Sequence, residues 1–269
     1  FGAKASLFTS RRCRRGVINT DDGWGRRLAR EASIEHVTYA VSGPADWTVR
    51  GVVADASGST FEAVNGQTAV PVRVRAPGMF NVANALAALV MLVLAGHRLQ
   101  DAAAALDSFH GVPGRMEVVP GDGPSVIVDY AHTPDAVERA LLAIRPLTQG
   151  RILCVMGCGG DRDAVKRPAM GAIAARFADL LVVTDDNPRS EDPAQIRHAV
   201  LSGARGVADA DVREIGDRAQ AIQAAVAFAE PGDTVMILGK GHETGQEVAG
   251  VLHPFDDRLV AQAALEARG

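Results

Sequence analysis

In the second part of the chain, short aliphatic runs alternate with longer amphipathic segments. The aliphatic runs are typical of strands that are buried on both faces of a parallel sheet. They cover residues 125–128, 151–156, 180–183, 212–215 and 234–238. The segments between and after them repeat apolar residues at helical spacing and cover residues 134–144, 168–177, 193–202, 218–229 and 258–267. This alternation predicts a Rossmann-like domain with a mostly parallel sheet covered by helices on both faces.

The first part of the chain has a different pattern, with more strands and fewer helices. Runs that are broken by Gly, Ser and Pro predict strands at 16–19, 36–40, 48–54, 60–64 and 70–74. Longer apolar segments predict helices at 24–31, 81–94 and 99–106. The turn Gly111-Val112-Pro113-Gly114 separates the two patterns. We therefore expect an α/β protein with two domains, residues 1–112 and 113–269.

Composition excludes several classes of protein. The chain has 269 residues, a 47% apolar and 22% charged composition and a net charge of −4, so we expect neither a nucleic-acid partner nor a membrane partner. Its cysteines, Cys13, Cys154 and Cys158, form neither a disulfide framework nor a structural zinc pattern, which favours a reducing cytoplasm. The longest apolar stretch, residues 82–95, is too short to span a bilayer. We expect a monomer.

The loop after the predicted strand 180–183 carries the strongest candidate chemistry. It contains Asp186, Asn187 and Arg189 within a few residues. A guanidinium can bind a carboxylate with two hydrogen bonds while a nearby aspartate faces an ammonium, so the loop suits a small zwitterion. The alternative is a polar turn in which Ser190 or Asp192 caps the next helix. Both interpretations can hold, because the cap would use only the later residues.

Polar loops also follow two other predicted strands. Residues 157–163, Gly-Cys-Gly-Gly-Asp-Arg-Asp, lack the third glycine of a dinucleotide fingerprint, which argues against a nicotinamide site and leaves Arg162 as a carboxylate anchor. Residues 239–243, Gly-Lys-Gly-His-Glu, resemble part of a P-loop but lack its upstream Gly and its Ser or Thr, and Glu243 can pair with an ammonium. Ligands of open α/β sheets bind at strand carboxyl ends, so we predict one site where these loops meet.

Further candidates lie near the predicted domain boundary and in the first domain. Asp129 ends an aliphatic strand, where a carboxylate can accept hydrogen bonds from ribose hydroxyls, and His132 follows, with a helix-capping role as the alternative. Asn81 and Asn84 share one helix face, either to recognise an adenine edge or to act as a cap and a core hydrogen-bonding group. Lys4 alone would be a solvated surface charge.

Several motifs occur together in an order that resembles the Mur ligases, specifically the diaminopimelate-adding members. The motifs are Phe1-Gly2-Ala3-Lys4-Ala5-Ser6-Leu7-Phe8, Phe80-Asn81-Val82-Ala83-Asn84-Ala85, Gly114-Arg115-Met116-Glu117, Asp129-Tyr130-Ala131-His132-Thr133-Pro134-Asp135, Asp186-Asn187-Pro188-Arg189 and Gly239-Lys240-Gly241-His242-Glu243. The resemblance covers essentially the whole chain. It implies the second half of a Mur-ligase central ATPase domain, followed by the family's Rossmann-like C-terminal domain.

The resemblance also implies an activity. Such an enzyme ligates meso-diaminopimelate to UDP-N-acetylmuramoyl-L-alanyl-D-glutamate through an acyl phosphate, using ATP and Mg²⁺, in cytoplasmic peptidoglycan synthesis. Lys4 matches the lysine that becomes carbamylated and then offers oxygen ligands to Mg²⁺. The implied nucleotide-binding residues are Asn81, Asn84, Arg115, Asp129, Tyr130 and His132. The implied diaminopimelate-binding residues are Arg162, Asp186, Asn187, Pro188, Arg189, Gly239 and Glu243.

The sequence departs from the family pattern in one large respect. The Gly-rich phosphate loop with its Lys-Thr, and the domain that holds the uridine nucleotide, are not found in residues 1–269. We therefore expect the C-terminal portion of a longer enzyme, one that does not turn over by itself. The alternatives are a non-catalytic amino-acid-binding module and another ligase of the superfamily, such as a folylpolyglutamate synthase or a cyanophycin synthetase. A nicotinamide oxidoreductase ranks behind them.

Overall fold

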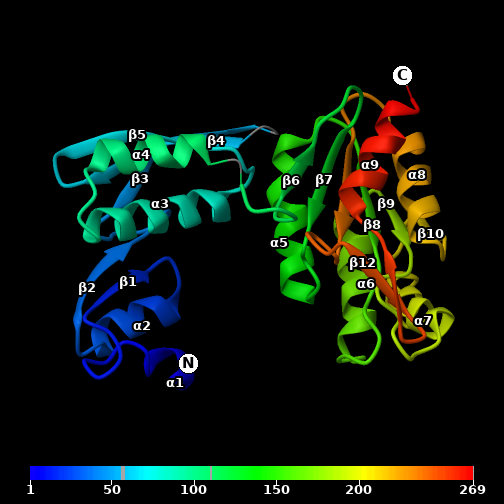
Figure 1. Cartoon of the computed structure of the whole chain (residues 1–269), viewed down its shortest axis with the longest axis horizontal. Helices are drawn as coiled ribbons and strands as arrows, with labels where there is room; N and C mark the ends of the chain where they lie inside the picture. The colour runs from blue at the N-terminus through cyan, green and yellow to red at the C-terminus, as the bar shows by residue number, and fades with distance from the viewer. Residues whose placement is uncertain (56–57, 110, 269) are drawn as a thin grey trace. The chain divides into compact units, whose positions relative to one another are not determined.

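The computed structural model describes residues 1–55, 58–109 and 111–268. The chain divides into two compact units, residues 1–110 and 111–269 (Figure 1). The domain boundary that we predict after residue 112 lies close to this division. Each unit has its own hydrophobic core, and each is considered separately.

The first unit contains two small sheets and two long helices. Strands β1 (Arg15–Asn19) and β2 (Glu35–Tyr39) pair in parallel on either side of α2 (Gly23–Glu31) in the chain. Strands β3 (Thr48–Asp55), β4 (Gly58–Asn65) and β5 (Thr68–Val74) form an antiparallel sheet. Helices α3 (Met79–Leu94) and α4 (Leu99–Ser108) follow, and a short helix α1 (Gly2–Ala5), which the sequence did not predict, begins the chain.

The core of the first unit forms because its sheet and helices each have one apolar face. In β5 the burial alternates, so that Val70, Val72 and Val74 are buried while the residues between them are exposed. These valines share one buried cluster with Leu86 and Leu89 of α3. The scarcity of aromatic residues thus produces a core built mainly from aliphatic side chains.

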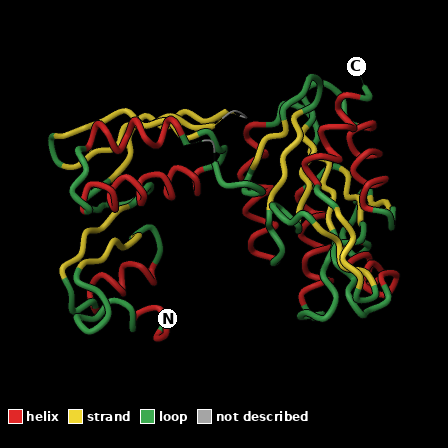
Figure 2. The backbone as a smooth tube through the Cα atoms, viewed as in Figure 1, coloured by secondary structure: helices red, strands yellow, loops and turns green. Residues whose placement is uncertain are grey.

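The second unit confirms the predicted Rossmann-like domain with its mostly parallel sheet. The strands are β6 (Glu117–Val119), β7 (Ser125–Asp129), β8 (Ile152–Met156), β9 (Leu180–Val183), β10 (Val212–Glu214) and β11 (Thr234–Leu238). Their order in the sheet is β10-β9-β8-β11-β7-β6, and only β6, which the sequence did not predict, is antiparallel to its neighbour. Figure 2 shows this sheet between two sets of helices.

Helices cover both faces of the six-stranded sheet. They are α5 (Pro134–Ile144), α6 (Lys166–Phe177), α7 (Pro193–Ala204), α8 (Arg218–Phe228) and α9 (Asp257–Glu266), and a short 3₁₀ helix η1 (Arg145–Leu147) follows α5. One face of the sheet, including Val155 and Val182, shares a buried cluster with Ala225 of α8 and Ala261 of α9. Helices α5, α6 and α7 pack in sequence against one another. The strands of the sheet centre are fully buried, as their aliphatic composition predicts.

A small hairpin completes the second unit. Strands β12 (Gly245–Val248) and β13 (Val251–Pro254) pair antiparallel after the loop that ends β11. The sequence analysis did not predict this hairpin, whose β13 is exposed throughout. Among the residues that the structure describes, no helix combines the length and the apolar character that crossing a bilayer requires.

Candidate functional site

The three polar loops that the sequence singled out follow neighbouring strands. Strands β9, β8 and β11 are adjacent in the sheet, and all three run parallel. Their carboxyl ends therefore meet at one edge, where loops 157–165, 184–192 and 239–244 begin. This is the edge at which open α/β sheets bind ligands. The predicted convergence of the three loops is correct.

The two aspartates that follow β9 have different environments. Asp185 pairs with Arg197 of α7, with 2.5 Å between Oδ1 and Nη1. Asp186 is buried, at 7% exposure, and among the described residues no hydrogen-bond donor reaches its carboxylate. Burial raises the pKa of Asp186, and the positive charges of Arg218 and Lys240 oppose that rise. Asp186 is therefore a buried acceptor that still lacks a donor.

Gly239 makes room for this carboxylate. A Cβ atom at position 239 would lie 2.5 Å from Oδ2 of Asp186, closer than any ordinary contact. The backbone φ of Gly239 is +115°, a value that residues with side chains rarely adopt. The first residue after β11 thus has to be glycine for the buried aspartate to lie against it.

Arg189 is held by both its backbone and its side chain. Its amide donates to the carbonyl of Glu247 over 3.0 Å, and its carbonyl accepts from Ala249 over 2.7 Å, which joins the loop to the β12–β13 hairpin. Nη1 donates to the carbonyl of Gly160 over 2.7 Å, and Nε lies 3.3 Å from Oε2 of Glu247. Among the described residues no hydrogen bond from Nη2 is found, so this part of the guanidinium can donate to a ligand carboxylate.

The glycine-rich loop after β8 packs tightly against the loop that carries Arg189. The amide of Gly160 donates to the carbonyl of Asn187 over 2.8 Å, and a Cβ at position 160 would lie 1.9 Å from the carbonyl oxygen of Pro188. Arg167 of α6 makes two 2.8 Å hydrogen bonds with the carboxylate of Glu191. This bidentate pair connects α6 to the end of the β9 loop and strengthens the contact between the two loops.

A buried lysine connects the β11 loop to the β9 loop. Lys240 is completely buried, and its Nζ donates to Oδ1 of Asn187 (3.0 Å), to the carbonyl of Gly245 (2.6 Å) and to Oε2 of Glu243 (3.3 Å). The sequence analysis placed Asn187 and Glu243 in the pocket but gave Lys240 no role. The available signal was the position of a cation two residues after a buried, mainly apolar strand.

A second buried cation lies next to the same edge. Arg218, at the start of α8, makes a bidentate ion pair with Asp257 of α9, with two 2.7 Å bonds and no exposed surface on either side chain. Its Nη2 also donates to the carbonyl of Leu238, the last residue of β11, over 3.0 Å. Arg218 thus connects two helices to the strand end that precedes Gly239. Sequence reasoning did not identify either member of this pair.

Three of the residues that were predicted to bind the nucleotide, Arg115, Tyr130 and His132, lie together in the second unit. The guanidinium carbon of Arg115 lies 4.6 Å from the ring centre of Tyr130, which is a cation–π distance. The ring of Tyr130 contacts His132 at 4.6 Å and His242 at 5.4 Å between ring centres. His132 does not cap α5, because Thr133 occupies the cap position and accepts from Ala136.

Asp129 has a structural task as well as a predicted binding role. Its Oδ2 accepts from the amide of Met116 and its Oδ1 from the amide of Ala131, each over 2.8 Å. Burial raises the pKa of Asp129, whereas these two amides lower it. The carboxylate therefore fixes the backbone next to Arg115, and each oxygen keeps a second lone pair.

The candidates of the first unit are more exposed. Asn81 lies inside α3, not at its cap, and its Nδ2 donates to the carbonyl of Pro77 over 2.8 Å. Asn84 is exposed, so the alternative of a core hydrogen bond is wrong for this residue. Lys4 is exposed on α1. Among the described residues, no group of three or more His, Cys, Asp and Glu side chains is placed to hold a metal ion.

Arg162 and Asp192, both in the predicted polar loops, have different surroundings. Arg162 is exposed, and its Nη1 donates to the carbonyl of Asp161, so its role as a carboxylate anchor stays a prediction. Asp192 caps α7 through the amide of Ala194, which confirms that the end of the β9 loop caps a helix.

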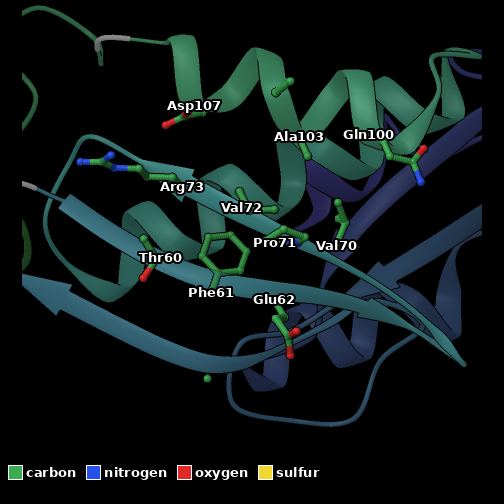
Figure 3. A pocket seen from close by; sticks show the side chains of 12 residues that line it. Thr60, Phe61, Glu62, Val70, Pro71, Val72, Arg73, Gln100, Ala103 and Asp107 are labelled. Carbon is green, nitrogen blue, oxygen red and sulfur yellow. The ribbon is translucent and has the colours of Figure 1, made fainter.

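A separate pocket of about 630 Å³ lies in the first unit, between α4 and strands β4 and β5 (Figure 3). Phe61, Val70 and Val72 contribute apolar side chains to it, and Arg73 and Asp107 contribute charged ones. None of the residues that the sequence analysis selected lines this pocket.

Comparison with known families identifies the chain. The sequence model of the Mur ligase middle domain matches residues 1–92, and that of the Mur ligase glutamate ligase domain matches residues 114–241. The chain belongs to the Mur ligase family. This membership confirms the predicted pair of domains, a Mur-ligase central domain followed by the C-terminal domain.

Several similar proteins share a name. The UDP-N-acetylmuramoyl-L-alanyl-D-glutamate–2,6-diaminopimelate ligase of Streptomyces coelicolor is 51% identical over 274 residues, 99% of this chain and 54% of that protein. The ligase of the same name from Synechococcus elongatus is 44% identical, over 100% of this chain and 54% of that protein. A solved structure of such a ligase is 37% identical with a TM-score of 0.68, and the match covers 99% of this chain and 56% of that one. The chain spans about half the length of the curated relatives it matches.

Proposed function

We propose that this chain contributes the amino-acid-binding domain and part of the nucleotide-binding domain of a ligase that adds meso-diaminopimelate to UDP-N-acetylmuramoyl-L-alanyl-D-glutamate. The reaction forms an amide bond through an acyl phosphate, as a step of peptidoglycan synthesis. We expect a monomer that acts in the cytoplasm. The proposal is supported by the relatives' names together with the polar side chains that follow the adjacent strands β8, β9 and β11.

The observation that carries the proposal is that one loop contains both Asp186 and Arg189, each with unused hydrogen-bonding capacity. Asp186 offers a buried carboxylate that no described donor contacts, which suits an ammonium group. Arg189 offers the free part of a guanidinium that Gly160 and Glu247 already hold in place. Asp186 can accept from an ammonium group and Arg189 can donate to a carboxylate. Together they match one amino-acid end of diaminopimelate.

The remaining predicted pocket residues have supporting roles in this proposal. Glu243 contributes a second carboxylate, Asn187 contributes an amide, and Pro188 and Gly239 shape the backbone around them. Arg162 is exposed beside the same loops, where it can approach a ligand carboxylate from outside. Because most of these groups are joined by hydrogen bonds before any ligand binds, little order has to be created on binding.

For the nucleotide, we propose that Asn81 and Asn84 recognise adenine, and that Arg115, Asp129, Tyr130 and His132 contact the rest of the molecule. These residues have polar groups to offer: the amide of Asn84 is exposed, and the guanidinium of Arg115 lies over the Tyr130 ring. ATP would supply the phosphoryl group that activates the substrate carboxylate. Lys4, as its carbamate, would offer oxygen ligands to Mg²⁺. The described residues do not form a metal site by themselves.

We also propose that residues 1–269 alone do not catalyse ligation. No Gly-rich loop with Lys-Thr occurs among them, and that loop is the family element which surrounds the ATP phosphates. A ligation assay on residues 1–269, with both substrates and ATP, should therefore give no product above background. Product formation by these residues alone would contradict this part of the proposal.

The test of the proposed pocket is calorimetric titration of the chain with meso-diaminopimelate and with L-lysine. Lysine lacks the distal carboxylate and would leave Arg189 without its ligand partner. A hydrogen bond to a charged group contributes about 1.5–3 kcal/mol, so we expect diaminopimelate to bind about 10- to 100-fold more tightly. Arg189→Ala should remove most of this preference, because the variant has no guanidinium left to bind the distal carboxylate that distinguishes diaminopimelate from lysine.

A matched control is Arg139→Ala, which removes an exposed arginine that pairs with Asp135 on the surface of α5. This variant should keep the preference for diaminopimelate. If the unaltered chain binds neither amino acid, or if Arg189→Ala discriminates between them as well as the unaltered chain does, the proposed pocket is wrong.

A further inference from the structure

Lys240 uses its whole hydrogen-bonding capacity inside the protein. A lysine ammonium group has three N–H donors, and the Nζ of Lys240 contacts three acceptors, on Asn187, Glu243 and Gly245. The side chain has no exposed surface. It therefore has no donor left for a ligand, and any effect on ligand binding has to pass through the groups that it holds.

The first of these groups is the carboxamide of Asn187. Its Oδ1 accepts from Nζ of Lys240 over 3.0 Å and from the amide of Glu247 over 3.0 Å. Its Nδ2 donates to Oε2 of Glu243 over 2.8 Å. With two donors at one end and an acceptor at the other, only one orientation of the amide satisfies all three partners. Lys240 thus fixes which end of Asn187 faces Glu243.

The second group is the carboxylate of Glu243. Its Oε2 accepts from both Asn187 and Lys240. Its Oε1 receives no hydrogen bond from the described residues, and the side chain is one-third exposed. One oxygen is therefore used to hold the carboxylate in place, and the other is left available to a cation. Removing Lys240 would leave the first oxygen with a single, weaker partner.

We propose that Lys240 is a positioning residue for ammonium recognition: it orients Asn187 and Glu243 so that Oε1 of Glu243 faces the ammonium group of the bound amino acid. This inference rests on the proposed function, since it takes the pocket to bind diaminopimelate. The contact with the carbonyl of Gly245 extends the same arrangement to the start of β12, which carries Glu247, the partner of Arg189.

The test compares two ligands that differ only in their ammonium groups. Pimelate has the same seven-carbon chain and both carboxylates as meso-diaminopimelate, but no amino group. Lys240→Met keeps the length of the side chain and removes its charge and its donors. We expect the unaltered chain to bind diaminopimelate at least about 30-fold more tightly than pimelate, and the variant to lower that ratio at least about tenfold.

The matched control is Lys166→Met, the same substitution at a lysine whose Nζ, within the described residues, donates to the carbonyl of His132 and to no other acceptor. It should leave the ratio unchanged. Both variants are first checked for the circular dichroism and the urea unfolding midpoint of the folded chain. A general loosening of the domain would weaken both ligands equally, so only the ratio reports on ammonium recognition.

Each outcome decides between the hypotheses. No binding of diaminopimelate to the unaltered chain contradicts the proposed function, and with it this inference. Selective binding by the unaltered chain together with an unchanged ratio in Lys240→Met overturns the role of Lys240 alone. If Lys240→Met does not fold, Lys240→Gln, which retains one donor group, replaces it. Failure of both variants to fold would assign Lys240 to stability only and overturn the proposal.

Discussion

The buried ion pair of Arg218 and Asp257 permits a sharp prediction about the stability of the second unit. We expect Arg218→Met to destabilise this unit strongly. The substitution keeps the apolar stem, so little packing is lost. It removes both 2.7 Å bonds to Asp257 and the bonds to the carbonyls of Leu238 (3.0 Å) and Asp185 (3.4 Å). It also leaves a carboxylate with no exposed surface without its cation.

The expected loss in the free energy of unfolding is about 3–5 kcal/mol, because breaking one side of a buried pair leaves an uncompensated charge. Domains have about 5–15 kcal/mol in total, so this loss approaches the whole stability of the unit. The double variant Arg218→Met/Asp257→Leu removes the orphaned charge as well, and we expect it to recover most of the loss. Arg139→Met, at the exposed pair with Asp135 in the second unit, should change stability by less than about 0.5 kcal/mol.

The chain provides an internal control for this experiment. Both of its tryptophans, Trp24 and Trp47, lie in the first unit. Tryptophan fluorescence during urea unfolding therefore follows that unit, while hydrogen exchange of peptides from residues 111–269 follows the other. Arg218→Met should abolish slow exchange in the second unit and leave the fluorescence transition in place.

Two results would refute this reasoning. A loss below about 1 kcal/mol for Arg218→Met would mean that the pair is far better solvated than its burial indicates. A double variant as unstable as the single one would mean that the bonds to the carbonyls of Leu238 and Asp185, and not the orphaned carboxylate, account for the effect.

Three further predictions concern the pocket and its surroundings. Asp186→Asn should stabilise the ligand-free chain, because burial raises the pKa of Asp186 in the folded state and its ionised form is therefore unfavourable there. The unaltered chain loses stability as the pH rises from 3.8, the ordinary pKa, through the raised pKa of the folded state. In urea unfolding, the extra stability of the variant should vanish below pH 3.8. Gly239→Ala should lower the free energy of unfolding by about 1–3 kcal/mol and abolish diaminopimelate binding. Gly123→Ala, with a similar φ of +105° but open space around it, should cost less stability and leave binding intact. Equal losses of stability in the two variants would rule out the steric argument. Burial raises the pKa of Cys158 to about 12, so at pH 8 mass spectrometry should find iodoacetamide on Cys13 and not on Cys158, unless the β8 loop opens.

Much of the second unit could be predicted because its strands are short aliphatic runs between polar loops. The predicted strands 180–183 and 234–238 coincide with β9 and β11. Parallel strands place their carboxyl ends at one edge, so the convergence of Asp186, Arg189 and Glu243 followed from the order of elements. The motifs of the family resemblance then connected these residues with an amino acid as ligand.

Other features depend on tertiary contacts that leave little trace in the sequence. Strand β6 (Glu117–Val119) has only three residues. In the hairpin, β12 is half-buried and β13 is exposed, and neither has the apolar alternation that would mark a strand. The burial of Lys240 arises from acceptors that lie up to 53 positions away in the chain. Asp129 also differs from expectation, because both its oxygens accept from the backbone, which the end of a strand does not reveal.

The backbone contacts of Arg189 have a consequence for how this protein can change its ligand. The bonds from its amide to Glu247 and from Ala249 to its carbonyl involve no side-chain atom, so they do not depend on the arginine side chain. The φ of +52° there is also tolerated by Asn and Gly. The backbone of the loop therefore keeps its conformation when the side chain at position 189 is replaced by that of Asn or Gly. We expect that a substitution at this position can change which amino acid the proposed pocket recognises without rebuilding the fold around it.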